Sequence, residues 1–153
     1  RDQAFRSATV VRGRELPLEL GRGESVLLAG KDRDFLSIGR RLYPEADVYR
    51  IRGGTFYDPP ADAADTFSRL ARRYDTVLYC LSDPATLSVL RRTEGMEARL
   101  AVVSILTPVY LRETPWVANA VAVYGWGTAS LEAAYAVLRG EITGEGLLPI
   151  DME

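Results

Sequence analysis

The chain has 153 residues, of which 47% are hydrophobic and 26% are charged, and its formal net charge is −2. This composition is typical of an ordinary folded domain, and the 19 basic residues are scattered, which argues against a disordered, fibrous, membrane-spanning or nucleic-acid-binding protein. Histidine is absent, which excludes a Ser-His-Asp or Cys-His catalytic group and any histidine-containing metal site within this chain.

Strands and helices are predicted to alternate along the chain. Five short apolar segments predict strands, at residues 26–29, 48–51, 76–81, 100–106 and 117–123. Apolar residues at helical spacing predict helices around residues 35–42, 67–74, 87–90 and 131–138. Because most strands are apolar on both faces, we expect helices to cover both faces of the sheet. The predicted fold class is α/β: a three-layer α/β/α, doubly wound, mostly parallel sheet of about five to six strands in the flavodoxin-like order 2-1-3-4-5.

Several helix ends carry recognisable signals. Asp83 and Thr107 each offer a capping oxygen directly before a proline, and Asp62 is a further candidate N-cap. Gly140 is placed to end the last helix. The segments outside the repeating pattern are residues 1–24, the long Gly- and Pro-containing loop 53–60, and residues 141–153.

Ligands of a doubly wound sheet bind at the carboxyl ends of its strands. A dinucleotide site needs Gly-x-Gly-x-x-Gly after the first strand, whereas this chain has GKDRD at residues 30–34. A phospho-receiver site uses acidic groups such as Asp32 and Asp83, a hydroxyl such as Thr107, and a lysine after the last strand. The chain's one lysine, Lys31, follows the first strand instead. Asp83 is therefore better explained as a helix cap.

The other candidate groups have simpler explanations. The turn Gly125-Trp126-Gly127 predicts a tight backbone turn rather than a phosphate cradle. The only cysteine, Cys80, lies in an apolar strand and is predicted to be a core residue. The glutamates that a glycosidase pair would need are predicted to be surface charges; they are Glu94, Glu97, Glu141 and Glu145. No catalytic, cofactor-binding or metal-binding residue is assigned in this chain.

Motifs in the same order and at similar spacing resemble the C-terminal domain of glycoside hydrolase family 3. They are SATVVR, LPL and SVLLAG at residues 7–12, 16–18 and 25–30, VSILTPVYL at 103–111, AVAVYGW at 120–126, AAYAVLRGEI at 133–142 and GEGLLPI at 144–150. The resemblance covers essentially all of residues 1–153 and implies a single domain. Because the sequence begins at Arg1 with no methionine, we expect it to be a fragment of a longer chain.

The resemblance also implies where the chemistry lies. In this family the nucleophilic aspartate belongs to an N-terminal (β/α)₈ barrel, and a barrel of about 250 residues does not fit in this chain. In the β-glucosidase-like branch, a long loop between the strands that match 76–81 and 100–106 supplies the acid/base glutamate. Here that interval holds only a helix capped by Asp83 and a turn at 93–99, which resembles the β-N-acetylglucosaminidase branch. That branch carries a His-Asp acid/base pair on the barrel, so the lack of histidine is expected.

The resemblance therefore implies an accessory domain of a retaining glycosidase that acts on terminal β-linked sugars, packed against a barrel as its partner and binding no cofactor. Aromatic side chains concentrate in interfaces, and Trp116 is one candidate. The candidate barrel-facing or strand-end residues are Asp83, Pro108, Tyr110, Tyr124 and Trp126. Two alternatives stay open: a free-standing flavodoxin-like or receiver-like module that binds a small ligand, and a scaffold domain that forms a homo-oligomer.

Overall fold

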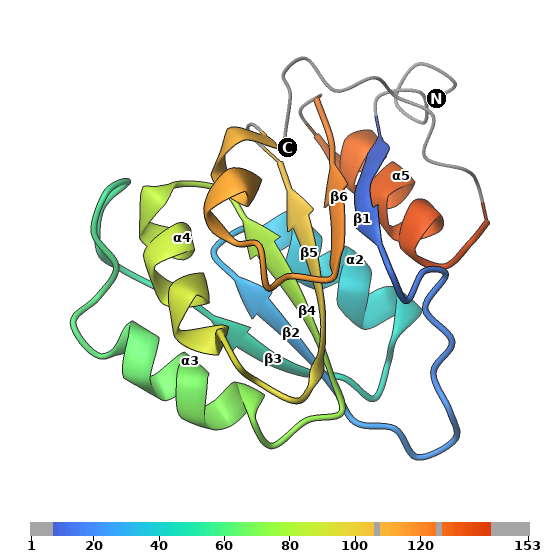
Figure 1. Cartoon of the computed structure of the whole chain (residues 1–153), viewed down its shortest axis with the longest axis horizontal. Helices are drawn as coiled ribbons and strands as arrows, with labels where there is room; N and C mark the ends of the chain where they lie inside the picture. Colours follow the sequence, from blue (N-terminus) through green and yellow to red (C-terminus); the bar gives the residue numbers. More distant parts are fainter. Residues whose placement is uncertain (1–7, 106–107, 125–126, 142–153) are drawn as a thin grey trace.

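Figure 1 shows a computed structural model of the chain, which describes residues 8–105, 108–124 and 127–141. The elements in chain order are β1 (Thr9–Gly13), β2 (Val26–Gly30), α2 (Arg33–Leu42), β3 (Asp47–Arg50), α3 (Ala63–Ala71), β4 (Thr76–Leu81), α4 (Pro84–Leu90), the 3₁₀ helix η1 (Arg91–Thr93), β5 (Arg99–Ser104), the 3₁₀ helix η2 (Pro108–Glu113), β6 (Asn119–Ala122) and α5 (Thr128–Leu138).

The six strands form one sheet in the order β1-β6-β5-β4-β2-β3. Strands β2 to β6 pair in parallel, and β1 pairs antiparallel with β6. Numbered among themselves, the five parallel strands follow the order 2-1-3-4-5, so the predicted α/β class and flavodoxin-like order are confirmed. The predicted repeat excludes β1. Residues of β1 pair with residues far later in the chain, for example Thr9 with Ala122, so no local sequence pattern predicts this strand.

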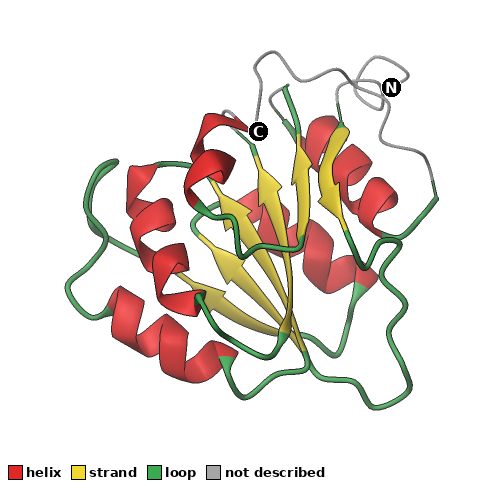
Figure 2. Cartoon of the chain, in the orientation of Figure 1, coloured by secondary structure: helices red, strands yellow, loops and turns green. Residues whose placement is uncertain are grey.

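Helices cover both faces of the sheet, α2 and α5 on one side and α3 and α4 on the other (Figures 1 and 2). Neighbouring residues of each strand point into different cores. Leu28 lies in the same core as Phe35 of α2 and Tyr135 of α5, whereas Leu27 lies in the core that contains Phe67 of α3. The strands are apolar throughout because both of their faces are buried.

The α2 and α5 helices approach each other closely at a glycine. A Cβ atom at Gly39 would collide with the Tyr135 hydroxyl and with Leu28. That hydroxyl donates a hydrogen bond to the Phe35 carbonyl at 2.8 Å, and the Phe35 and Tyr135 rings stack with centroids 5.1 Å apart. Burial raises the pKa of Tyr135 well above its ordinary value. The phenol therefore acts here as a neutral hydrogen-bond donor.

The helix ends agree only in part with the sequence signals. Asp83 caps α4 as predicted, and Gly140 ends α5 with the two hydrogen bonds of a Schellman motif. Asp62 precedes α3 but makes no capping hydrogen bond, because its backbone is already helical (φ −98°, ψ −5°) and an N-cap needs an extended backbone. Pro108 begins a 3₁₀ helix rather than an α-helix, and its predicted cap, Thr107, lies outside the described residues.

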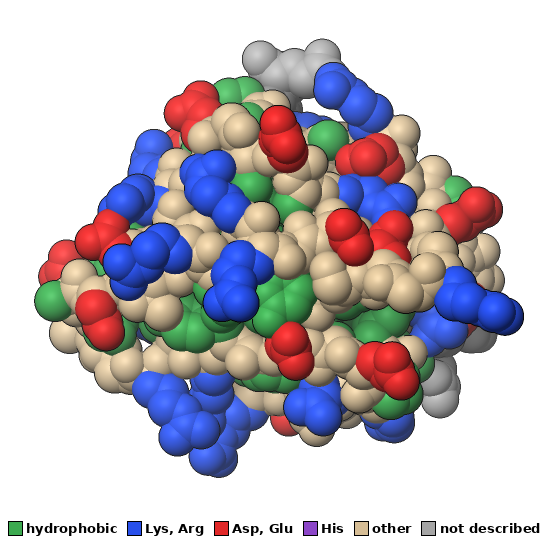
Figure 3. All heavy atoms as spheres, turned by 90° about the horizontal axis from the view of Figure 1, so that it is seen from below, with side chains coloured by type: hydrophobic (Ala, Val, Ile, Leu, Met, Phe, Trp, Pro, Cys, Tyr) green, Lys and Arg blue, Asp and Glu red, His purple; other side chains and the backbone are tan. Residues whose placement is uncertain are grey.

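Two further expectations concern the interior and the surface. Cys80 is fully buried, as predicted, and burial raises the pKa of its thiol. Figure 3 shows Lys and Arg side chains interspersed with Asp and Glu side chains over the face seen from below. None of the described helices has the length and apolar character needed to cross a membrane.

Candidate functional site

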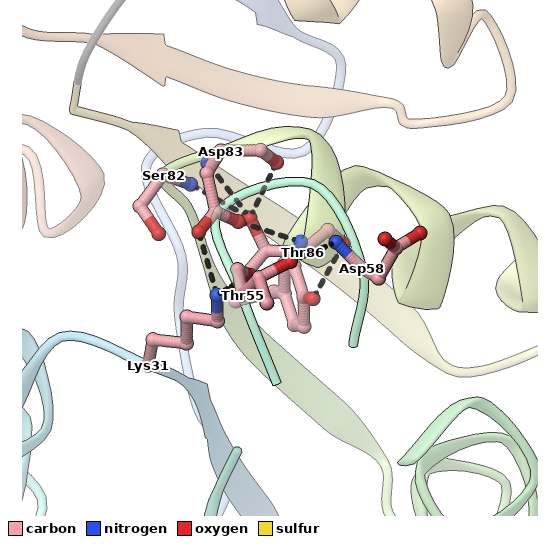
Figure 4. Close-up of polar contacts among 7 residues, drawn as sticks. Lys31, Thr55, Asp58, Ser82, Asp83 and Thr86 are labelled. Atoms are coloured by element: carbon pink, nitrogen blue, oxygen red, sulfur yellow. Dashed lines mark hydrogen bonds and ion pairs between the residues drawn. The ribbon is translucent and has the colours of Figure 1, made fainter. Parts of the chain in front are cut away.

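The switch point of the sheet lies between β2 and β4. From β2 the chain adds β3 on one side of β2 and then β4 on the other side, so the strand order reverses here. In doubly wound sheets, the crevice that binds ligands forms at the carboxyl ends of the two strands where the order reverses. The residues that leave these two strands are Lys31, after β2, and Ser82 and Asp83, after β4. Figure 4 shows them together with the loop that follows β3.

Lys31 and Asp83 form a largely buried ion pair at this point. The Lys31 Nζ lies 2.7 Å from the Asp83 Oδ2, and the two side chains are 21% and 8% exposed. The same ammonium donates to the Thr55 carbonyl at 2.8 Å. Lys31 thus joins the ends of β2 and β4 to the loop after β3.

Asp83 uses its other oxygen as a helix cap. Its Oδ1 accepts from the Thr86 amide at 2.7 Å, and the Thr86 hydroxyl accepts from the Asp83 amide at 3.0 Å, which completes a capping box. The Thr86 hydroxyl also accepts from the Ser82 amide at 2.9 Å. Both carboxylate oxygens of Asp83 therefore have a partner, and Asp83 serves the fold at this site.

The loop 53–60 folds over the start of α4. The Ala85 amide, one of the free donors in the first turn of α4, donates to the Phe56 carbonyl at 3.1 Å. Within the loop, the Thr55 amide donates to the Asp58 carbonyl at 2.8 Å, and the Asp58 amide donates to the Thr55 hydroxyl at 3.0 Å. These bonds fix a loop whose tip carries two aromatic side chains.

The tip of this loop is the most exposed apolar feature among the described residues. Phe56 and Tyr57 are 48% and 70% exposed, and their rings pack edge to face with centroids 5.0 Å apart. Val109 of η2 is exposed as well. Tyr110 is half-buried; burial raises its pKa, and the nearby charges of Asp83 and Tyr57 raise it further. We call Phe56, Tyr57, Val109 and Tyr110 the carboxyl-edge patch.

The residues predicted from sequence do not all lie together. Asp83 is buried and Pro108 is buried at the start of η2, and Tyr110 lies near Asp83. Tyr124 follows β6, which is separated from β4 by β5, and it neighbours Thr9 of β1. Burial raises the pKa of the Tyr124 phenol, and the Thr9 hydroxyl partly offsets this. Trp126 lies outside the described residues.

Trp116, the other aromatic candidate, lies at the opposite edge of the sheet, before β6. It is half-buried, and its indole nitrogen donates to the Thr93 hydroxyl at 3.0 Å. A hollow of about 380 Å³ there is lined by Trp116, Met96, Arg99 and Glu15 among others. Trp116 therefore belongs to the amino edge, away from the switch point.

The predicted surface glutamates are exposed where they are described. Glu94 and Glu97 are exposed in the turn after η1, as predicted. Glu141 is exposed and pairs with Arg139 at 3.2 Å, whereas Glu145 lies outside the described residues. Among the residues that the structure describes, no three Cys, Asp or Glu side chains come together in an arrangement that could hold a metal ion.

The sequence missed the carboxyl-edge patch as a unit. Phe56 and Tyr57 lie in a segment recognised only as a loop, and Val109 and Tyr110 lie more than 50 residues later in the sequence. One sequence signal was available for Phe56 and Tyr57: two adjacent aromatic residues lie between glycines and prolines. Such a segment indicates a loop, and because loops run over the surface, these aromatic side chains are expected to be exposed rather than in the core.

Comparison with solved structures shows the same fold in family 3 glycosidases. The chain superposes with a TM-score of 0.80 on a fungal multi-domain family 3 β-N-acetylglucosaminidase, at 19% identity over 98% of this chain and 18% of that chain. A family 3 β-N-acetylglucosaminidase from Paenibacillus sp. FPU-7 gives 0.77, at 17% identity over 97% of this chain and 31% of that one. A family 3 β-glucosidase from Bifidobacterium adolescentis gives 0.65, at 16% identity over 92% and 26%.

These likenesses confirm at the level of fold the resemblance found in the sequence motifs. This chain spans between 18% and 31% of the length of these three enzymes. No protein-family model matches the chain, and no curated protein matches its sequence significantly.

Proposed function

We propose that this chain is the accessory C-terminal α/β domain of a retaining family 3 glycoside hydrolase, of β-N-acetylglucosaminidase type, and that it packs against a catalytic (β/α)₈ barrel in the same parent chain. The observation that carries the proposal is the superposition over nearly the whole chain on less than a third of each family 3 enzyme. The rest of such an enzyme has room for a barrel of about 250 residues.

The connection between β4 and β5 supports the β-N-acetylglucosaminidase type. After Asp83 it consists of α4, η1 and the five residues 94–98, and both glutamates of that turn are exposed. It holds no extended loop that would deliver a glutamate to a neighbouring domain. The absence of histidine from the sequence fits chemistry that is carried elsewhere.

The carboxyl-edge patch is the surface we assign to the barrel. It joins aromatic and aliphatic side chains from loop 53–60 and from η2 at the carboxyl edge of the sheet, and aromatic residues are enriched in the buried cores of interfaces. The hydrogen bonds that fix loop 53–60 hold Phe56 and Tyr57 in place before any partner binds. A surface fixed in advance loses less conformational entropy on docking.

The receiver-like alternative is disfavoured by Asp83. A phosphoryl acceptor needs a carboxylate oxygen open to its donor, whereas Oδ1 accepts from the Thr86 amide and Oδ2 is paired with Lys31. The side chain of Asp83 is also 8% exposed. This residue therefore fits the role of a helix cap and crosslink better than that of a phosphorylation site.

Two measurements test the proposal. The purified chain and the full-length product of the gene are assayed with an aryl β-N-acetylglucosaminide; we expect hydrolysis by the full-length product and none above buffer by the chain. Hydrogen exchange then compares the two proteins. Slower exchange at residues 53–60 and 108–113 in the full-length product supports the assigned surface, and hydrolysis by the chain alone overturns the proposal.

A further inference from the structure

Three arginines that have no ion-pair partner among the described residues gather beside the switch point. Arg50 ends β3, Arg52 follows two residues later, and Arg33 begins α2. Tyr49 and Ile51, which alternate with Arg50 and Arg52, point into the core shared with α3. Arg50 is thereby directed to the α2 side of the sheet.

Arg50 is incompletely satisfied. Its Nε is buried and has no hydrogen-bond partner among the described residues. Burial lowers the pKa of its guanidinium, and the charges of Arg33 and Arg52 lower it further, while Asp32 acts in the opposite direction. Buried donors in proteins are almost always hydrogen-bonded, so an unpaired one at a surface hollow points to an absent acceptor.

A hollow of about 450 Å³ lies in front of these groups. Its lining is Lys31, Asp32, Arg33, Asp34, Arg50 and Ser82. The charge of Lys31 is balanced by Asp83, with which it is paired. Asp32 caps α2 by accepting from the Phe35 amide and keeps its negative charge. Three arginines, Arg33 and Arg50 with Arg52 beside them, remain against two carboxylates, Asp32 and Asp34, which leaves one excess positive charge at the hollow.

We propose that this hollow binds a small oxyanion, namely a phosphate group, through Arg50 and Arg33 with Arg52 nearby. A phosphate oxygen supplies the acceptor that Arg50 lacks, and arginine recognises phosphate through parallel N–H donors. The phosphate is either inorganic or carried by a small organic ester, and the hollow lies in the size range of small-molecule sites. The site does not depend on the proposed glycosidase role.

The test follows the Arg50 Nε–Hε signal by NMR during titration of the chain with inorganic phosphate and, separately, with glycerol 3-phosphate at constant ionic strength. We expect a saturable shift, with the amides of residues 31–34, 50–52 and 82 moving in parallel. Tighter binding of the ester identifies an organic phosphate as the ligand, and equal binding identifies the free ion.

Variants separate a site from general charge attraction. R50Q and the exposed variant R33Q are each expected to weaken binding by about tenfold or more, the effect of one charge-assisted hydrogen bond. R69Q removes an exposed arginine of α3, on the other face of the sheet, and is expected to bind as the unmodified chain does. A shift that does not saturate, or one equally weakened by R69Q, overturns the proposal.

Discussion

Replacing Asp83 tests the role that the structure gives it. D83A removes the cap on the Thr86 amide, worth about 1 kcal/mol. It also leaves Lys31 without its carboxylate. Removing one partner costs about 3–5 kcal/mol in fully buried pairs and about 0–1 kcal/mol in exposed pairs. Because Lys31 is 21% exposed and keeps the Thr55 carbonyl, we assign about 1–2 kcal/mol to this loss. The expected total is about 2–3 kcal/mol.

Urea denaturation at pH 7 measures this loss, with the slope m unchanged. D83N separates the two contributions, because asparagine caps helices as well as aspartate but carries no charge. It is expected to lose about 1–2 kcal/mol, and a double-mutant cycle with K31M is expected to give a coupling free energy of about the same size. The reasoning is refuted if D83A lies within about 0.5 kcal/mol of the unmodified chain, the usual range of surface substitutions.

Three further predictions concern the packing that supports the site. G39A drives a Cβ into the Tyr135 hydroxyl and is expected to lower the free energy of unfolding, measured by urea denaturation, by about 1–3 kcal/mol. The control S37A, on the exposed side of α2, is expected to change it little. Equal effects of the two substitutions would contradict the close approach of α2 and α5. R12A removes the guanidinium that donates to the carbonyls of Leu111, Thr114 and Val117. It is expected to lower the free energy of unfolding by about 2–4 kcal/mol, whereas R14A, which replaces an exposed arginine, is expected to change it little. Tyr135, whose pKa burial raises above 10.0, stays protonated when folded while the unfolded chain ionises, so stability is full below pH 10 and falls as the pH rises above it. Thermal melts against pH should show a shallower alkaline decline for Y135F, and an identical decline would count against this assignment.

The fold was predictable wherever the signal is local. Strands buried on both faces, such as β4, are apolar at every position, and helices between them keep the helical period, which together define the parallel sheet. β1 was not predicted because only one of its five residues, Thr9, is buried and because its partner strand lies at the other end of the sequence. The predicted N-cap at Asp62 was wrong because residue type alone does not reveal the backbone angles that a cap requires.

The site was predictable only one residue at a time. The Asp83-Pro84 pair announces a helix cap, and the structure confirms it. The ion pair with Lys31 joins residues 52 positions apart, and it depends on β2 and β4 being neighbours in the sheet. The carboxyl-edge patch likewise depends on loop 53–60 folding over α4, which is fixed by backbone hydrogen bonds that no sequence pattern records.

The mass of the native protein that contains this chain tests the central claim most directly. Antibodies raised against the chain, followed by intact mass spectrometry of the captured protein, give that mass. An accessory domain of a barrel-containing glycosidase predicts a polypeptide longer than this chain by at least the roughly 250 residues of a barrel. A mature protein of 16.9 kDa, the mass of the chain alone, would contradict the claim.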